Sequence, residues 1–316
     1  MPEQPQPSSD SLRQSGGAIP GEPGLAAFNL TMPQPSALPV LIAVPHAGRT
    51  YPGAVTAQMR NPGFSTLKLE DRFVDRLGEA VARATGAALL VAHAPRAMID
   101  LNRAADDVDW EMITRDQADL PVGGKPPGLR VRSGLGLIPR RLPGLGELWK
   151  QPLSETELTA RIGSIHVPYH QCLSDSLAQL RARWGAALLL DLHSMPPLSP
   201  RGMAAGAQLV LGDRFGVSCD GALVASCFGY FAQGARLAAH NRPYAGGYVL
   251  ERHADPDQGI HALQLEIDRT CYLDSRMAEP GPGFADTVAL LVGLVRRLAS
   301  DVADLGQPAS WANAAE

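Results

Sequence analysis

Two histidines stand at the ends of apolar runs, and both have the side chain to bind a metal ion. His46 follows the run PVLIAVP, and His193 ends the run GAALLLDLH. Two imidazoles need a third ligand, usually a carboxylate, to leave one position open for water on a catalytic zinc ion. Glu70 and Asp71 are the nearest acids downstream of His46. Either could be that ligand, although acids also favour the start of a helix because of the helix dipole.

His166 and His170 form a competing pair. They lie four residues apart in HVPYH, a spacing that would place both on one helix face. The segment is not an H-E-x-x-H motif, because Val167 stands where the glutamate would be, and Pro168 distorts the turn. We therefore favour the two histidines at the ends of the apolar runs.

Two acids lie inside otherwise apolar segments. Asp191 precedes His193 by two residues and lies on the same side of the expected strand, and Glu266 lies on the polar side of the alternating run HALQLEIDR. Burying an unpaired charge costs several kcal/mol, so each needs a partner or a function. Asp191 is interpreted as a structural ion-pair residue or as a carboxylate that supports the metal site. Glu266 is either paired or a general base with a tuned pKa.

Two further segments offer groups that could hold a substrate. In PRAMIDLNR, Asn102 beside Arg103 suits a carboxylate, which arginine can grip with two hydrogen bonds, although an exposed salt-bridge cluster with Arg96 and Asp100 is the alternative. In NRPYAGGYVLERH the two adjacent glycines allow close backbone approach. The candidate contacts there are Asn241, Gly247, Tyr248 and Arg252.

The surrounding sequence alternates apolar runs with helical patterns. Strands are expected at residues 39–46, 87–95, 185–193, 207–213 and within 261–269. Leu69, Phe73, Leu77 and Val81 recur at steps of four and predict a helix that starts near Glu70 and stops at Gly86, and a Ser154–Glu157 capping box starts a second helix that Pro168 should kink or break. This alternation predicts an α/β fold with a mixed, mostly parallel sheet, in which ligands bind at the carboxyl ends of strands.

Composition sets the expected boundaries. Residues 1–36 are rich in Pro, Gly, Ser and Gln and are expected to form a disordered tail, residues 37–305 a single catalytic domain, and residues 306–316 a flexible tail. Residues 119–147 form a Gly/Pro-rich stretch with several arginines, which we interpret as an excursion over the site.

Charge and cysteine content limit the function classes. The net charge of −4 does not favour binding to nucleic acid. None of the four cysteines forms a C-x-x-C pair, so they are expected to be reduced thiols. The apolar run near the C-terminus carries Asp286, Arg296 and Arg297 and is too short to span a bilayer. We expect a cytoplasmic protein without membrane or nucleic-acid partners, as a monomer or weak dimer.

Taken in order, several of these blocks resemble the N-formylglutamate amidohydrolase family. They include VPHAGRTYP, LEDRFVDRL, PRAMIDLNR, LLLDLHSMP, NRPYAGGY and GIHALQLEIDRTCYLD. The resemblance implies a three-layer phosphorylase/hydrolase-like fold that is distantly similar to zinc carboxypeptidases. It implies one zinc ion held by His46, His193 and Asp71 or its neighbour Glu70. It also implies that Glu266 is the general base and that Asn102 and Arg103 bind a carboxylate.

The hypothesis that follows is zinc-dependent hydrolysis of an N-acyl amino acid, most simply N-formyl-L-glutamate to L-glutamate and formate in histidine degradation. In it Arg96 stabilises the oxyanion, Arg103 binds one substrate carboxylate, and Arg140 or Arg252 binds the other. The alternatives are a related zinc hydrolase for another N-acyl or peptide-like substrate, a non-catalytic protein that binds a small ligand, and a nucleic-acid module that uses the arginine-rich loop.

Overall fold

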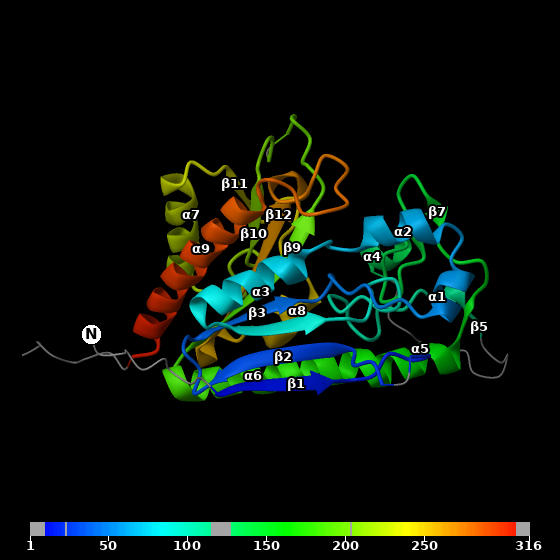
Figure 1. Ribbon diagram of the computed structural model, residues 1–316, viewed down its shortest axis with the longest axis horizontal. Helices are drawn as coiled ribbons and strands as arrows, with labels where there is room; N and C mark the ends of the chain where they lie inside the picture. Colours follow the sequence, from blue (N-terminus) through cyan, green and yellow to red (C-terminus); the bar gives the residue numbers. More distant parts are fainter. Residues whose placement is uncertain (1–9, 23, 115–127, 203, 308–316) are drawn as a thin grey trace, which may run out of the picture.

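One eight-stranded sheet runs through the protein (Figure 1). The computed structural model describes residues 10–22, 24–114, 128–202 and 204–307. The strand order is β1-β2-β4-β3-β9-β12-β10-β11, and four of the seven neighbouring pairs are parallel. The expected α/β fold with a mixed, mostly parallel sheet is confirmed. The strands of this sheet are β1 (Asp10–Gly16), β2 (Phe28–Gln34), β3 (Val40–Val44), β4 (Ala88–Ala92), β9 (Ala187–Met195), β10 (Leu209–Gly212), β11 (Ala238–His240) and β12 (Ile260–Asp268).

Four central strands bring their carboxyl ends to one edge of this sheet. β4, β3, β9 and β12 are parallel neighbours, and every residue of β3 and β9 is buried. Strands that are covered on both faces read as continuous apolar runs, which is why 39–46 and 185–193 were recognisable in the sequence. His46 lies two residues beyond β3, whereas β9 continues two residues past His193.

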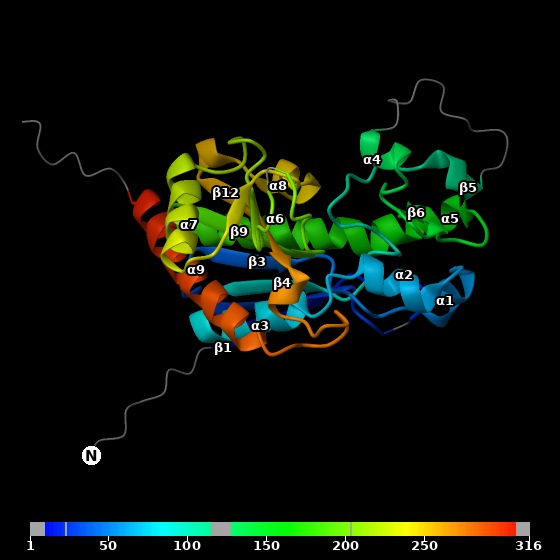
Figure 2. The ribbon, with the colours of Figure 1, turned by 90° about the horizontal axis from the view of Figure 1, so that it is seen from above.

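Helices cover both faces of the sheet and complete a three-layer arrangement (Figure 2). One core cluster joins the sheet to α3, α7 and α9, and the other joins it to α5, α6 and α8. These helices are α3 (Val74–Thr85), α5 (Glu155–Arg161), α6 (Val167–Trp184), α7 (Gly221–Gln233), α8 (Tyr248–His253) and α9 (Phe284–Leu305). All four cysteines are free. No helix in the described ranges is both long and apolar enough to cross a membrane.

The first predicted helix begins later than expected. A separate helix, α2 (Pro62–Leu69), ends where the four-residue periodicity starts, and α3 begins only at Val74. Between them Phe73 has a left-handed backbone with φ of 59°, which is unusual for a residue other than glycine and breaks the helical path. Gly86, with φ of 79°, ends α3 as predicted. Glu70 and Asp71 therefore lie in a turn and do not start a helix.

The second predicted helix has the expected N-terminal cap, but its interruption is not a simple kink or break at Pro168. The capping box between Ser154 and Glu157 is present. A π-helical segment, η2 (Ile162–His166), joins α5 to α6. Pro168 lies in the first turn of α6 and has no N–H to donate, and the carbonyl oxygen of Ser164, four residues before it, accepts from the backbone N–H of Ala18. The break that Pro168 predicted is therefore a π-helical turn just before it.

The expected disordered tail of residues 1–36 is wrong for most of its described part. β1 and β2 pair with each other along their whole length, and β2 joins the sheet against β4. β2 buries Phe28, Leu30 and Met32 on one face. The average composition of the segment hid this short alternation, and β1 is an edge strand that contributes backbone hydrogen bonds with few apolar side chains. Residues 1–9 and 308–316 lie outside the described residues.

Short elements gather at one end of the molecule, away from α7 and α9 (Figure 1, Figure 2). They include the described part of the Gly/Pro-rich stretch, since residues 119–127 lie outside the described ranges. The short elements at this end are α1 (Gly53–Gln58), η1 (Trp110–Met112), β5 (Ile113–Thr114), α4 (Leu129–Arg132), β6 (Arg141–Leu142), β7 (Gly146–Glu147) and β8 (Leu153–Ser154). Two other short helices, η3 (Pro256–Gln258) and η4 (Arg269–Cys271), precede and follow β12.

Candidate metal centre and active site

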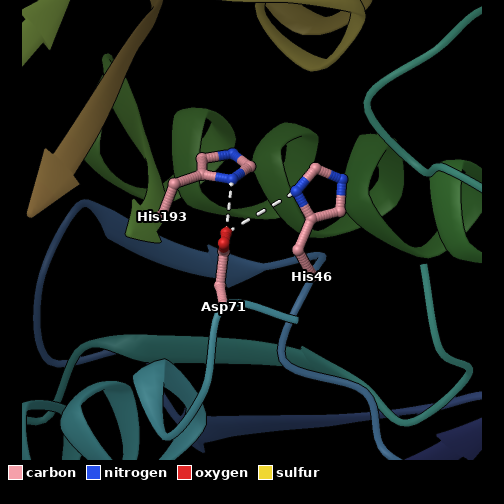
Figure 3. Close-up of side chains that lie close together, drawn as sticks. All are labelled: His46, Asp71 and His193. Atoms are coloured by element: carbon pink, nitrogen blue, oxygen red, sulfur yellow. Dashed lines mark hydrogen bonds and ion pairs between the residues drawn. The ribbon is translucent and has the colours of Figure 1, made fainter. Parts of the chain in front are cut away.

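His46, Asp71 and His193 lie together at the carboxyl edge of the sheet (Figure 3). One ligand atom from each lies within 4.8 Å of the others, and all three side chains are buried. Nδ1 of His193 lies 3.1 Å and Nδ1 of His46 lies 3.6 Å from the same oxygen, Oδ2 of Asp71. Two imidazole nitrogens and one carboxylate oxygen that converge in this way form a donor set that suits zinc.

The turn before α3 selects Asp71 over Glu70. The backbone N–H of Asp71 donates to the carbonyl oxygen of His46 at 2.9 Å, which anchors the turn beside the end of β3. Glu70 instead accepts a hydrogen bond from Nη1 of Arg72 at 2.9 Å, and its side chain is not part of the cluster. Of the two acids that the sequence left open, Asp71 is the one that lies beside the histidines.

Each histidine has a second carboxylate behind it. Asp100 Oδ1 lies 2.7 Å from Nε2 of His46, and Asp191 Oδ2 lies 2.8 Å from Nε2 of His193. An ionised carboxylate only accepts hydrogen bonds, so both Nε2 atoms carry the hydrogen. The Nδ1 atoms of both rings then face Asp71, in the orientation that carboxylate–histidine pairs give to metal ligands. Without a metal ion, a second proton on Nδ1 can donate to the Asp71 carboxylate.

The cluster favours positive charge. Burial by itself would lower the pKa of His193, yet Asp191 and Asp71 raise it well above its usual value. Burial would raise the pKa of Asp71, but hydrogen bonds from His193 and His46 hold it well below its usual value. Acids that stabilise a proton on buried imidazole also favour a divalent cation at the same point, so the residues present fit a metal ion.

Glu266 lies beside this cluster in the next strand. It is the register partner of His193 in the parallel pair of β12 with β9, and only 7% of its surface is exposed. Burial raises its pKa to about 7, although nearby His193 opposes the shift. A carboxylate with a pKa near neutral pH is suited to take up and return a proton.

A cavity of about 1320 Å³ opens from the cluster. This volume is larger than most small-molecule sites, which span roughly 300–1,000 Å³. Most of the sequence-predicted site residues line it, namely His46, Asp71, Arg96, Asn102, Arg103, His193, Gly247, Tyr248 and Glu266. Six separate segments of the chain therefore meet around one space.

Arg96 and Arg103 bring positive charge to this cavity. Nε of Arg96 lies 2.9 Å from Oδ2 of Asp100, which leaves the rest of its guanidinium group available. Arg103 donates to the backbone carbonyls of Leu135 and Asn102 and, within the described residues, forms no ion pair with a carboxylate within 4.0 Å. A largely buried guanidinium without an anionic partner is a candidate binding group for an anionic ligand.

Three predicted substrate-binding side chains do not line the cavity. Arg140 is held by Asp109, Glu111 and Glu147, with nitrogen–oxygen distances of 2.7–3.2 Å. Asn241 donates to Asp213 Oδ1 at 2.6 Å, and Arg252 donates to the hydroxyl of Tyr248 at 2.7 Å. Each has the right chemistry for binding an acid, but local sequence does not show which way a loop side chain points.

Several cavity residues were not selected from the sequence. Arg269 follows β12 directly, and its guanidinium bonds the Ser194 hydroxyl at 3.1 Å and Asp71 Oδ1 at 3.3 Å. Its position next to Glu266 in HALQLEIDR was the available signal. The other lining residues of this kind are Lys68, Arg130, Arg132, Arg141, Ser194, Arg214, Tyr244 and Gln264.

The competing pair His166 and His170 lies outside the cavity lining. His170 Nδ1 lies 2.9 Å from Nε2 of His253, and Nε2 of His166 lies 2.9 Å from the carbonyl oxygen of Arg103. Burial lowers the pKa of His170 to about 2 and that of His253 to about 3, so these rings are neutral. Within the described part of the chain, the group of three or more side chains positioned to hold a metal is the one around Asp71.

Comparisons with known proteins identify the family of the chain. The family model for N-formylglutamate amidohydrolase matches residues 38–273. N-formylglutamate deformylases of Pseudomonas aeruginosa and Pseudomonas putida are each 31% identical, over 76% and 75% of this chain and 84% and 82% of their own length. The crystal structure of N-formylglutamate amidohydrolase from Ralstonia eutropha is 32% identical with a TM-score of 0.78, covering 88% of this chain and 99% of that one.

A more distant solved structure shares the fold. A gene product from Agrobacterium tumefaciens is 17% identical with a TM-score of 0.64, and the match covers 89% of this chain and 96% of that chain. The similarity to zinc carboxypeptidases stays a prediction from the sequence. The family match, the two relatives and the site lead to one conclusion: the chain is an amidohydrolase and belongs to the N-formylglutamate amidohydrolase family.

Proposed function

We propose that this protein hydrolyses the amide bond of N-formyl-L-glutamate to give L-glutamate and formate, with one zinc ion held by His46, Asp71 and His193. The observation that carries the proposal is the convergence of Nδ1 of both histidines on Oδ2 of Asp71, beside a buried glutamate and in a cavity whose lining includes several arginines. When bound there, zinc supplies Lewis acidity that lowers the pKa of a water molecule toward about 7. The relatives named for N-formylglutamate support the choice of substrate.

Glu266 moves the proton in this proposal. Its carboxylate takes a proton from the attacking water and later delivers it to the leaving nitrogen as the carbon–nitrogen bond breaks. A pKa raised to about 7 matches both steps, because the same group must accept a proton and then donate it. Arg96 lies in the cavity next to Asp100 and opposes the negative charge that develops on the carbonyl oxygen.

Arg103 and Arg130 are the residues proposed to bind the two substrate carboxylates. Arg103 is buried against two backbone carbonyls and has room for an anion. Arg130 lies on α4 in the cavity lining, in the role for which the sequence suggested Arg140 or Arg252, neither of which reaches the cavity. Two separate guanidinium groups match a substrate with two carboxylates.

Formate release from N-formyl-L-glutamate by zinc-loaded protein is the direct test. N-formyl-L-glutamine, which has the same shape without the second negative charge, is the matched control and should react more slowly. His193→Ala should bind zinc poorly and lose turnover. Stoichiometric zinc in His193→Ala would overturn the ligand set, and equal rates with both substrates would overturn the choice of an acidic substrate. In Glu266→Gln with zinc retained, a fall in turnover of less than about tenfold would rule out its role as base, since general bases contribute about 10²–10⁴.

A further inference from the structure

A line of three buried polar side chains connects the substrate cavity to Glu266. Nδ2 of Asn102 donates to Oε1 of Gln264 at 3.2 Å, and Nε2 of Gln264 donates to Oε1 of Glu266 at 3.0 Å. Each of the three residues is at most 7% exposed, and each lines the cavity. Gln264 and Glu266 lie two residues apart in β12, so they project to the same side of the strand.

The direction of this line is fixed by a backbone group outside it. The backbone N–H of Val249, in α8, donates to Oδ1 of Asn102 at 2.9 Å. A backbone N–H can only donate, so this atom of Asn102 must be its carbonyl oxygen and the amide nitrogen must face Gln264. Gln264 then meets that nitrogen with its oxygen, which turns its own NH₂ group toward Glu266. In both hydrogen bonds of the line, the NH₂ donor therefore points toward Glu266.

We infer that Gln264 is a positioning residue that reserves one oxygen of Glu266 as an acceptor, so that proton transfer in the proposed reaction takes place at the other oxygen. Oε1 already accepts from Nε2 of Gln264. The proton that leaves water forms its new O–H bond at Oε2, and it passes from Oε2 to the leaving nitrogen when the carbon–nitrogen bond breaks. This inference rests on the proposed function, because it assigns an atom to the base step.

The same line of hydrogen bonds connects Glu266 to the proposed binding site for a substrate carboxylate. Within the described residues, Gln264 is the one acceptor bonded to Nδ2 of Asn102, so the second hydrogen of this amide remains for a substrate carboxylate beside Arg103. Gly247 leaves the space for Asn102, because a Cβ at position 247 would lie 2.4 Å from its Oδ1. One hydrogen-bonded unit therefore sets both where the substrate is held and how the base is turned.

Gln264→Leu is the first test, with Gln264→Met as a second variant of similar size in case leucine impairs folding. Either change removes the donor to a charged group, and turnover should fall about 10- to 100-fold, the range expected for a lost hydrogen bond to a charge. Bound zinc should stay within about twofold of the wild type, because the zinc ligands are not altered. KM should rise as well, because Asn102 loses the acceptor that holds its amide group. Leu265→Met, on the opposite face of β12, is the control and should keep both kcat and KM.

A double-mutant cycle with Glu266→Gln separates positioning from a general structural effect. If Gln264 acts only through Glu266, Gln264→Leu should change the residual rate of the Glu266→Gln protein by no more than about twofold. Equal losses in both backgrounds would overturn the inference, as would wild-type turnover of Gln264→Leu. If Glu266→Gln itself stays active, the assigned base is wrong, and that outcome contradicts the proposed function instead.

Discussion

Asp191 and His193 lie two residues apart in β9, and the Asp191 carboxylate holds Nε2 of His193 at 2.8 Å. Asp191 has no exposed surface, and no hydrogen-bond partner for its Oδ1 is found among the described residues. Among the described residues, the buried carboxylate of Asp191 therefore forms a side-chain hydrogen bond with His193 alone. A carboxylate in a central, fully buried strand is costly unless it serves such a purpose.

We expect Asp191→Asn to weaken zinc binding about 10- to 100-fold, because the carboxylate behind a metal-binding histidine sets its orientation and basicity. Competition with a chelator of known affinity measures the change. Asp220→Asn, which alters the cap of the distant helix α7, should leave zinc affinity unchanged. Unchanged affinity in Asp191→Asn would mean that the strand alone orients the ring.

Gly247→Ala should impair substrate binding without a backbone penalty. The φ of Gly247 is −115°, which other residues adopt readily, but a Cβ there would lie 2.4 Å from Oδ1 of Asn102. Asn102 must then move, so KM should rise and kcat should fall. Gly229→Ala in α7, where nothing lies within 4 Å of an added Cβ, is the matched control and should be neutral or stabilising by about 0.5–1 kcal/mol. Steady-state kinetics and thermal unfolding of both variants check this, and normal kinetics in Gly247→Ala would contradict the steric argument.

The rate should depend on pH through Glu266. Burial raises the pKa of this residue to about 7 without a metal ion, and a bound zinc ion lowers it from there. A general base acts only when it is deprotonated. Below this pKa, kcat/KM should fall about tenfold per pH unit as the proton stays on, and above it the rate should level off. A pH–rate profile on zinc-loaded protein measures this limb. A flat profile between about pH 5 and 8 would show that another group controls the step.

Arg130→Gln and Arg140→Gln should behave differently although both remove one positive charge. Arg130 lines the cavity, so its loss should raise KM for N-formyl-L-glutamate more than for N-formyl-L-glutamine. Arg140 lies outside the cavity lining and is held by three acids, so its loss should leave KM unchanged and cost stability by about 0–1 kcal/mol, as for surface ion pairs. Kinetics with both substrates decide, and equal effects of the two substitutions would contradict a specific role for Arg130.

Predictions from the sequence were best for features that depend on a single strand or helix. β9 is covered on both faces, so its continuous apolar run indicated a central strand, and His193 at its end was already a candidate ligand. The Ser154 capping box is equally local and was also recognised. In each case the physical cause lies within about ten residues of the feature.

Predictions from the sequence failed or stayed open where distant parts of the chain meet. Asp71 and Glu70 are adjacent acids in the turn between α2 and α3, and the left-handed Phe73 that ends this turn is not a glycine that would signal it. Asp100 and His46 are 54 positions apart in sequence. Their side chains meet only because β4 lies beside β3 in the sheet. The spacing of residues along the sequence does not show which strands are neighbours in the sheet.

The β1 strand, which average composition assigned to a tail, also controls what the sheet edge offers to other molecules. β2 carries Phe28, Leu30 and Met32, and without β1 its outer side would present a row of open N–H and C=O groups next to this apolar surface. Such an edge is a template for pairing with a second chain. β1 replaces it with a strand whose Arg13 and Gln14 are exposed and polar. A protein that begins at Gly17, and so keeps β2 without β1, would therefore be prone to aggregate through its sheet edge.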